Sequence, residues 1–188
     1  FGLRTAWVDF TQPAALEQIQ AQNPAMVWLE SPTNPLLKVI DLEAVCAITQ
    51  PLGIPVVVDN TFATALVQRP LELGATLSLT STTKYINGHS DALGGAVCTN
   101  DPEWHQKMVF SQKALGLQPS PFDCWLITRG IKTLPLRLKQ QMANAAALAD
   151  QLAGHAKVNW VRYPHRSDHP QHQVCLLYTS DAADDLIG

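Results

Sequence analysis

One lysine in the sequence, Lys84, has neighbours suited to covalent chemistry. The hydroxyl residues Ser81-Thr82-Thr83 directly precede it, and Asn87-Gly88 forms a turn shortly after it. The alternation of polar and apolar residues at 76–79 predicts a strand that leads into this run. At the end of a core strand, desolvation favours the neutral lysine amine, which can form a Schiff base with an aldehyde, and nearby hydroxyls can bind a phosphate. The alternative is a strand-end lysine that points into solvent.

An acidic residue, Asp59, directly follows the apolar run 54–58, which predicts a buried strand. An unpaired carboxylate at a buried edge is costly, so we expect Asp59 to have a polar partner. The alternative is that Asp59 or Asn60 caps the N-terminus of a following helix.

A rigid loop at residues 30–35 follows another short apolar run. Its two prolines and one asparagine cannot continue a strand. In open α/β sheets, ligands bind at the carboxyl ends of parallel strands, which is where this loop would lie. Two roles are therefore open for Asn34, namely contact with a ligand and closure of the turn.

The elements that must position these residues alternate between strands and helices, which predicts a parallel α/β sheet. The expected strands are residues 25–29, 54–58, a run from 76 towards Lys84, and 96–99, with a further strand-like run at 158–163. The expected helices begin near Thr11, Asp41, Asp101 and Ser120, and a longer helix spans 133–152. The glycines form neither a GxGxxG nor a P-loop motif, so phosphate binding by those routes is unsupported.

The composition excludes several classes of protein. Of the 188 residues, 46% are hydrophobic and 15% are charged, and the net charge is -3, as in ordinary globular proteins. This charge gives no basic surface for nucleic acid. No apolar run is long enough to cross a bilayer and no signal peptide is visible, so we expect no membrane partner and a cytoplasmic location.

The spacing of cysteine and histidine argues against a disulfide framework or a metal site. The four cysteines are Cys46, Cys98, Cys124 and Cys175. They form no CxxC pair, so we expect reduced thiols. His165, His169 and His172 are irregularly spaced in a polar loop, and we expect no metal there.

Four stretches form an ordered set of motifs. They are Leu29-Glu30-Ser31-Pro32-Thr33-Asn34-Pro35, Val56-Val57-Val58-Asp59-Asn60-Thr61-Phe62, Ser81-Thr82-Thr83-Lys84-Tyr85-Ile86-Asn87-Gly88-His89-Ser90-Asp91, and Pro119-Ser120-Pro121-Phe122-Asp123-Cys124-Trp125-Leu126 followed by Arg129-Gly130. In this order and spacing they resemble the Cys/Met-metabolism (trans-sulfuration) family of pyridoxal-phosphate enzymes, in its cystathionine γ-synthase/γ-lyase-like branch. The resemblance covers most of residues 25–164.

The resemblance implies a three-layer, mostly parallel α/β sheet of the fold-type I (aspartate aminotransferase-like) kind, with pyridoxal 5'-phosphate (PLP) as cofactor. It also implies an enzyme that forms or cleaves the C–S bond of cystathionine or a related sulfur amino acid, a small-molecule substrate. Lys84 would be the catalytic residue and would hold the cofactor, and Asp59 would bond its pyridine nitrogen. The other implied cofactor contacts are Ser81 and Thr83 to the phosphate, and Thr61 and Asn34 to the ring and its 3′-oxygen.

The resemblance further implies that the chain is part of a longer enzyme. Residues 1–140 would belong to the large PLP-binding domain, 141–174 would be a linking helix and the start of a C-terminal domain, and 175–188 would be a non-native, adapter-derived tail. Family residues that complete the site would lie before Phe1 and after Pro164, so we expect the fragment alone to be inactive. We expect the full-length parent to be a homo-oligomer, a tetramer.

Two hypotheses of function from different classes stay open. The first is a PLP-dependent transferase or carbon–sulfur lyase, with cystathionine β-lyase and O-acyl-homoserine sulfhydrylase as alternatives in the same family. The motif at 119–125 weakly favours the γ-synthase/γ-lyase branch. The second is a non-catalytic α/β binding domain, and the presence of both Lys84 and Asp59 argues against it.

Overall fold

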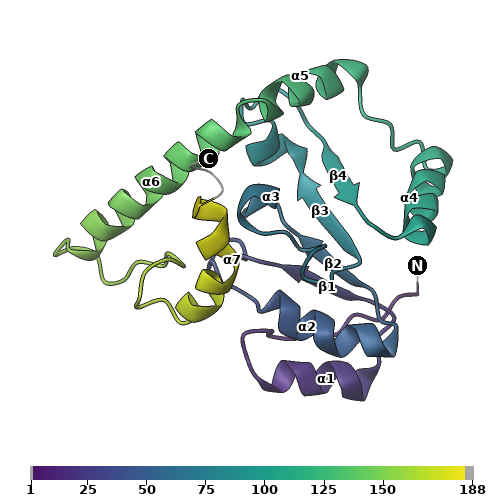
Figure 1. Cartoon of the computed structure of the whole chain (residues 1–188), viewed down its shortest axis with the longest axis horizontal. Coiled ribbons are helices and arrows are strands. Elements are labelled where there is room, and N and C mark those ends of the chain that lie inside the picture. The colour runs from purple at the N-terminus through teal and green to yellow at the C-terminus, as the bar shows by residue number, and fades with distance from the viewer. Residues whose placement is uncertain (1, 185–188) are drawn as a thin grey trace.

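The fold is built on a four-stranded sheet. The computed structural model describes residues 2–184, with side chains described up to residue 178 (Figure 1). In sheet order, the strands are β1 (Val27–Glu30), β2 (Val56–Asp59), β3 (Leu77–Ser81) and β4 (Gly95–Cys98). β1, β2 and β3 are parallel to one another, and β4 is antiparallel to β3. The mostly parallel α/β sheet expected from the resemblance is therefore confirmed.

Helices connect the strands and cover the sheet. They are α1 (Ala14–Gln22), α2 (Leu42–Thr49), α3 (Thr64–Val67), α4 (Pro102–Ala114), α5 (Pro121–Ile131), α6 (Leu134–Ala153) and α7 (His172–Asp184), with a 3₁₀ turn η1 (Gln50–Leu52) and a π-helical turn η2 (Thr82–Ile86). In Figure 1, α1 and α2 lie side by side below the sheet, while α5 and α6 form a long arm at its other end. Both helices of this arm contact η2, the turn that carries Lys84.

Side-chain caps set the start of three helices. Asp41, Asp101 and Ser120 accept backbone N–H bonds from the first turns of α2, α4 and α5. Each such cap stabilises a helix by about 1 kcal/mol. These are the starts that the sequence predicts. By contrast, α1 begins after Pro13 without a side-chain cap.

A single apolar core lies between the sheet and the pair α1 and α2. Val56, Val57 and Val58 of β2 are each no more than 3% exposed, so this strand is buried on both faces. The core cluster is Ile19, Val27, Leu29, Ile40, Leu42, Val45, Cys46, Ile54, Val56, Val58 and Ala75. Because tightly packed strands resist displacement, β2 is a firm base for the polar residues that follow it.

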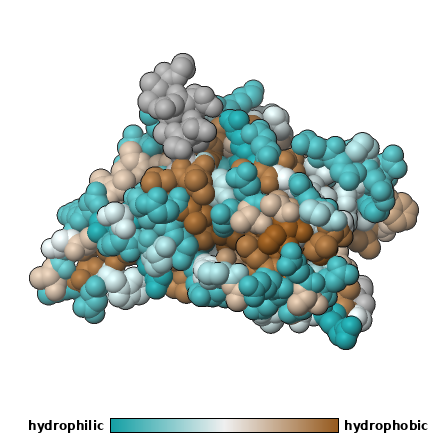
Figure 2. Space-filling view, turned by 60° about the horizontal axis from the view of Figure 1, so that its bottom comes forward, coloured by the Kyte–Doolittle hydropathy of each residue, from teal (hydrophilic) through white to brown (hydrophobic). Residues whose placement is uncertain are grey.

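Large apolar side chains also reach the surface. Figure 2 shows brown hydrophobic groups among hydrophilic ones on one face of the molecule. On and between α4 and α5, Phe110, Leu117, Phe122 and Trp125 are each more than half exposed. Exposed apolar groups gathered in this way are typical of surfaces that contact other protein segments.

One predicted element differs from the structure. Residues 158–163 form no strand, because a strand needs a hydrogen-bonded partner and this segment pairs with neither edge strand, β1 nor β4. The antiparallel return of β4 along β3 is consistent with the expected mostly parallel sheet. In addition, residues 62–73, which give few periodic signals, contain the short helix α3.

The predicted domain division and the non-native tail remain predictions. The boundary after residue 140 lies within α6, and α7 includes the start of the predicted tail. Cys175 is buried, and the Tyr178 hydroxyl donates to Asp41 Oδ1 at 2.7 Å. Burial and this bond raise the pKa of Tyr178. In the part of the chain that is described, no helix has the length and apolar character needed to cross a bilayer.

Candidate active site

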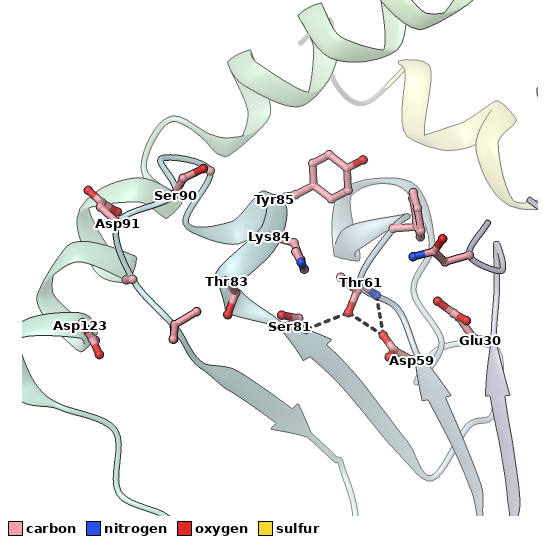
Figure 3. A pocket seen from close by; sticks show the side chains of 15 residues that line it. Glu30, Asp59, Thr61, Ser81, Thr83, Lys84, Tyr85, Ser90, Asp91 and Asp123 are labelled. Carbon is pink, nitrogen blue, oxygen red and sulfur yellow. Dashed lines mark hydrogen bonds between the residues drawn. The ribbon is translucent and has the colours of Figure 1, made fainter.

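An open cavity of about 1010 Å³ lies at the carboxyl ends of the parallel strands. Figure 3 shows its lining side chains converging from β1, β2, β3 and η2. All six residues that the sequence analysis names as site residues line it. They are Asn34, Asp59, Thr61, Ser81, Thr83 and Lys84. The register explains part of this convergence, since Glu30 pairs with Asp59 and Asp59 with Leu79 across adjacent strand ends.

Asp59 is held by Thr61, two residues further along the chain. Asp59 Oδ1 accepts from the Thr61 N–H at 3.0 Å and from the Thr61 hydroxyl at 2.6 Å. The helix-cap alternative for Asp59 and Asn60 is wrong, because α3 begins only after Ala63. Among the described residues, no donor reaches the second carboxylate oxygen of Asp59. Asp59 lines the cavity, so this oxygen is available to a ligand bound there.

Thr61 also joins two strand ends. Its hydroxyl donates to Asp59 and accepts the Ser81 N–H at 2.8 Å, as the dashed lines in Figure 3 show. The end of β2 and the end of β3 are therefore connected through one hydroxyl group. The Thr61 side chain thereby fixes the orientation of the Asp59 carboxylate.

Lys84 enters the cavity from η2. Its backbone departs from helical geometry, with φ -87° and ψ -119°, inside the turn formed by Thr82–Ile86. Figure 3 shows its amine on the side of the cavity where Thr61 and Asp59 lie. The side chain is exposed, so the desolvation expected from the sequence is absent in this chain. The reason is that the cavity is open and no described element covers the lysine.

The two hydroxyls expected at a phosphate differ in their partners. The Thr83 hydroxyl donates to the Gly94 carbonyl at 3.2 Å and accepts the Gly94 N–H at 2.9 Å. Ser81 gives only its backbone N–H, to Thr61, and its hydroxyl has no partner among the described residues. Ser81 is therefore the freer donor, while Thr83 must exchange a backbone partner to bind an anion.

Several residues that line the cavity have no role in the sequence analysis. Phe62 and Tyr85 form an aromatic pair with ring centroids 6.2 Å apart. Glu30, Asp91 and Asp123 add carboxylates to the lining. All five residues lie inside the four quoted motifs, so membership of a motif was the sequence feature that could have marked them as site residues. Their placement around one cavity depends on strand and helix packing, which motif membership alone does not specify.

His89 makes a hydrogen bond within its own loop, which is a structural role. Its Nδ1 lies 2.6 Å from the Asn87 carbonyl oxygen. A carbonyl only accepts hydrogen bonds, so Nδ1 carries the proton. Among the described residues, no group of three or more histidine, cysteine, aspartate or glutamate side chains could hold a metal ion.

Comparison with known proteins fixes the family. The sequence profile of the Cys/Met metabolism PLP-dependent enzymes matches residues 1–186. The chain belongs to this family. A probable cystathionine gamma-synthase of Herpetosiphon aurantiacus is 46% identical over 173 residues, which cover 92% of this chain and 54% of that protein. A cystathionine gamma-lyase of Dictyostelium discoideum is 45% identical over 93% of this chain and 45% of its own length.

Solved structures of this PLP-dependent family share the fold. The cystathionine gamma synthase of Xanthomonas oryzae pv. oryzae, in complex with cystathionine, superposes with a TM-score of 0.89 at 47% identity, over 92% of this chain and 44% of that one. A methionine gamma lyase of Micromonospora echinospora gives 0.92 at 42% identity, over 95% and 49%. The chain thus spans about half the length of the relatives that it matches.

Members of the Cys/Met metabolism family depend on PLP, and the described residues fit most of that cofactor. Lys84 offers an amine for the aldehyde, and Asp59 offers a free carboxylate oxygen for a protonated ring nitrogen. The lining offers little positive charge to the cofactor's phosphate. Among the described residues that line the cavity, Lys84 is the one cationic side chain and four are carboxylates. A dianionic phosphate therefore needs positive charge from outside this lining.

Proposed function

We propose that this chain is the cofactor-binding part of a PLP-dependent enzyme that forms or cleaves the C–S bond of cystathionine or a related sulfur amino acid. The observation that carries the proposal is the convergence of Lys84 and Asp59 on one cavity, with Thr61 holding Asp59 in place. A non-catalytic binding domain has no need to retain an amine and a held carboxylate in this arrangement.

The cofactor, when bound, supplies an electron sink for the negative charge that develops on the substrate's α-carbon. Asp59 would hold a proton on the ring nitrogen, because a carboxylate next to that nitrogen favours its charged form. Thr61 keeps the Asp59 carboxylate oriented through its 2.6 Å hydrogen bond. Lys84 would hold the cofactor through its amine, and the same amine would move protons at the α- and β-carbons of the substrate.

The phosphate end of the site calls for residues beyond the described lining. Ser81 would donate its free hydroxyl, Thr83 would give up its bond to Gly94, and Asn34 would contact the ring substituents. The missing positive charge would come from other parts of the parent protein or from a second copy of it. We propose a homo-oligomeric parent in the cytoplasm, and the exposed apolar groups on α4 and α5 support such contacts.

The choice between synthase and lyase rests on parts of the pocket outside this chain. Relatives named for both activities match at 44–46% identity. Small differences in transition-state contacts decide such specificity, so the shared residues do not separate the two. A product assay with the intact parent would compare cystathionine cleavage with formation of cystathionine from an activated homoserine ester and cysteine.

Hydride trapping tests the proposal on the intact protein. After incubation with PLP, borohydride reduction should fix the cofactor to the peptide that contains Lys84, as measured by peptide mass spectrometry. K84A should abolish the adduct. K139A, which removes an exposed lysine of α6, is the matched control and should keep it. An adduct that persists at other lysines in K84A, or its absence in the wild type, would refute the proposal.

A further inference from the structure

We propose that Arg137 is a positioning residue for Lys84. Its guanidinium, on α6, holds the turn that carries the lysine and so sets where the Lys84 amine lies relative to Asp59. This inference rests on the proposed function of Lys84 as the residue that binds the cofactor. Arg137 lies outside the cavity lining, and none of the four sequence motifs contains it.

The guanidinium of Arg137 reaches the turn directly. Nη1 donates to the Tyr85 carbonyl at 2.9 Å, and Nη2 donates to the Ile86 carbonyl at 3.2 Å. These are the two residues that follow Lys84. Nη2 also donates to the Gly130 carbonyl at 2.9 Å, and Nε to the Thr133 hydroxyl at 3.0 Å. One side chain therefore ties the lysine turn to the end of α5 and the start of α6.

All four acceptors are neutral oxygens. No carboxylate lies within ion-pair distance of Arg137 in the described part of the chain. A cation at the carboxyl end of a helical turn is favoured by the orphan carbonyls there. The guanidinium also presents several N–H groups in a rigid plane, which suits a set of fixed carbonyls better than a lysine ammonium does. The side chain thus acts as a clamp on backbone oxygens and not as half of a salt bridge.

Two glycines give an independent argument for the clamp. Gly88 has φ +73°, and a side chain there would overlap the Arg137 guanidinium. At Gly130, a side chain would overlap the Asn87 carbonyl oxygen. Both glycines belong to motifs singled out by the sequence, yet neither belongs to the chemistry of the cofactor. They allow α5, α6 and the lysine turn to approach closely enough for Arg137 to reach its acceptors.

The clamp connects to Lys84 through the hydrogen bonds of the turn. The Gly88 N–H donates to the Lys84 carbonyl at 2.8 Å, and the Asn87 N–H to the Thr82 carbonyl at 3.0 Å. If Arg137 releases the carbonyls of Tyr85 and Ile86, these two bonds lose their support. The backbone of Lys84 then becomes free to move, and its amine spends less time facing the cofactor carbonyl.

The test compares R137M, R137K and K139M in the intact protein. Hydrogen–deuterium exchange of the apo form reports on the Asn87 and Gly88 amides, with the β2 amides as an internal reference. In R137M, these two amides should exchange about tenfold faster or more, while β2 is unchanged, because the turn loses both of its charge-assisted hydrogen bonds from Arg137. R137K should be intermediate. K139M, which removes an exposed charge from the same helix, should match the wild type.

A second readout links the clamp to the lysine. The rate of hydride-trapped PLP attachment at Lys84 should fall severalfold in R137M and not in K139M. An unchanged rate, or equal acceleration of exchange in the turn and in β2, would overturn the positioning role. If the wild type itself forms no adduct, the proposed function fails instead, whatever Arg137 does to the turn.

Discussion

Replacing Thr61 by valine tests whether its hydroxyl joins the ends of β2 and β3. Valine keeps the branched shape of threonine but neither donates to Asp59 nor accepts the Ser81 N–H. The backbone N–H of Thr61 still bonds Asp59 Oδ1 at 3.0 Å, so the carboxylate keeps one partner. The variant should therefore fold, with a lower free energy of unfolding.

The expected loss follows from these two bonds. A hydrogen bond to an ionised carboxylate contributes about 1.5–3 kcal/mol, and the partial exposure of Asp59 favours the lower value. Leaving the Ser81 N–H without an acceptor costs about 1 kcal/mol more, again because the group is only partly buried. The sum is about 2.5 kcal/mol. For a chain of 150–250 residues this corresponds to a melting temperature lower by about 5–10 °C.

Urea unfolding followed by circular dichroism measures this loss. T61S is the control, because serine keeps the hydroxyl and removes only a methyl group, so its loss should stay below about 1 kcal/mol. A loss below about 0.5 kcal/mol in T61V, or equal losses in T61V and T61S, would refute the role of the hydroxyl.

Three further predictions concern other parts of the chain. Gln68 Nε2 donates to the buried Ser31 carbonyl and to the buried Asn60 Oδ1, each at 2.9 Å. Gln68→Leu should therefore lower the free energy of unfolding by about 2–5 kcal/mol. An unchanged urea midpoint would contradict this. Burial raises the pKa of Cys46 to about 11. At pH 8, a thiol reagent should therefore label the exposed Cys98 and Cys124 but not Cys46, as measured by peptide mass spectrometry. Equal labelling of all three would count against the burial of Cys46. Burial lowers the pKa of His169 in the folded protein. Below about pH 6.5, the His169 imidazole therefore binds a proton in the unfolded chain but stays neutral in the native state. Stability should therefore fall as the pH decreases through that range, and H169Q should flatten the profile.

Much of the fold could be predicted because its signals are local. The runs around Val27 and Val56 are apolar and each follows a proline, Pro24 or Pro55, and both find hydrogen-bonded partner strands in the sheet. Asp41, Asp101 and Ser120 cap helices through backbone groups only two or three residues away. The strand expected at 158–163 failed for the opposite reason, since a strand depends on a partner that local pattern does not supply.

The candidate site divides in the same way. Each predicted site residue ends a strand or follows one, and parallel strands bring their carboxyl ends to one edge of a sheet, so convergence on a cavity could be expected. The exposure of Lys84 could not, because it depends on what covers the cavity. The two hydrogen bonds between the Thr83 hydroxyl and the Gly94 backbone could not be expected either, because they require the return of β4 beside β3.

The sequence by itself determined the order of the strands along the chain, most helix starts and the set of chemical groups at the strand ends, because each depends on neighbours within a few residues. Tertiary structure alone decided which groups far apart in the chain contact one another. Arg137 lies 52 residues from Tyr85 in the chain, and its bond to that carbonyl exists only because α6 packs on η2. Such contacts depend on the distance between packed elements, and no periodicity or motif in the chain encodes that distance directly.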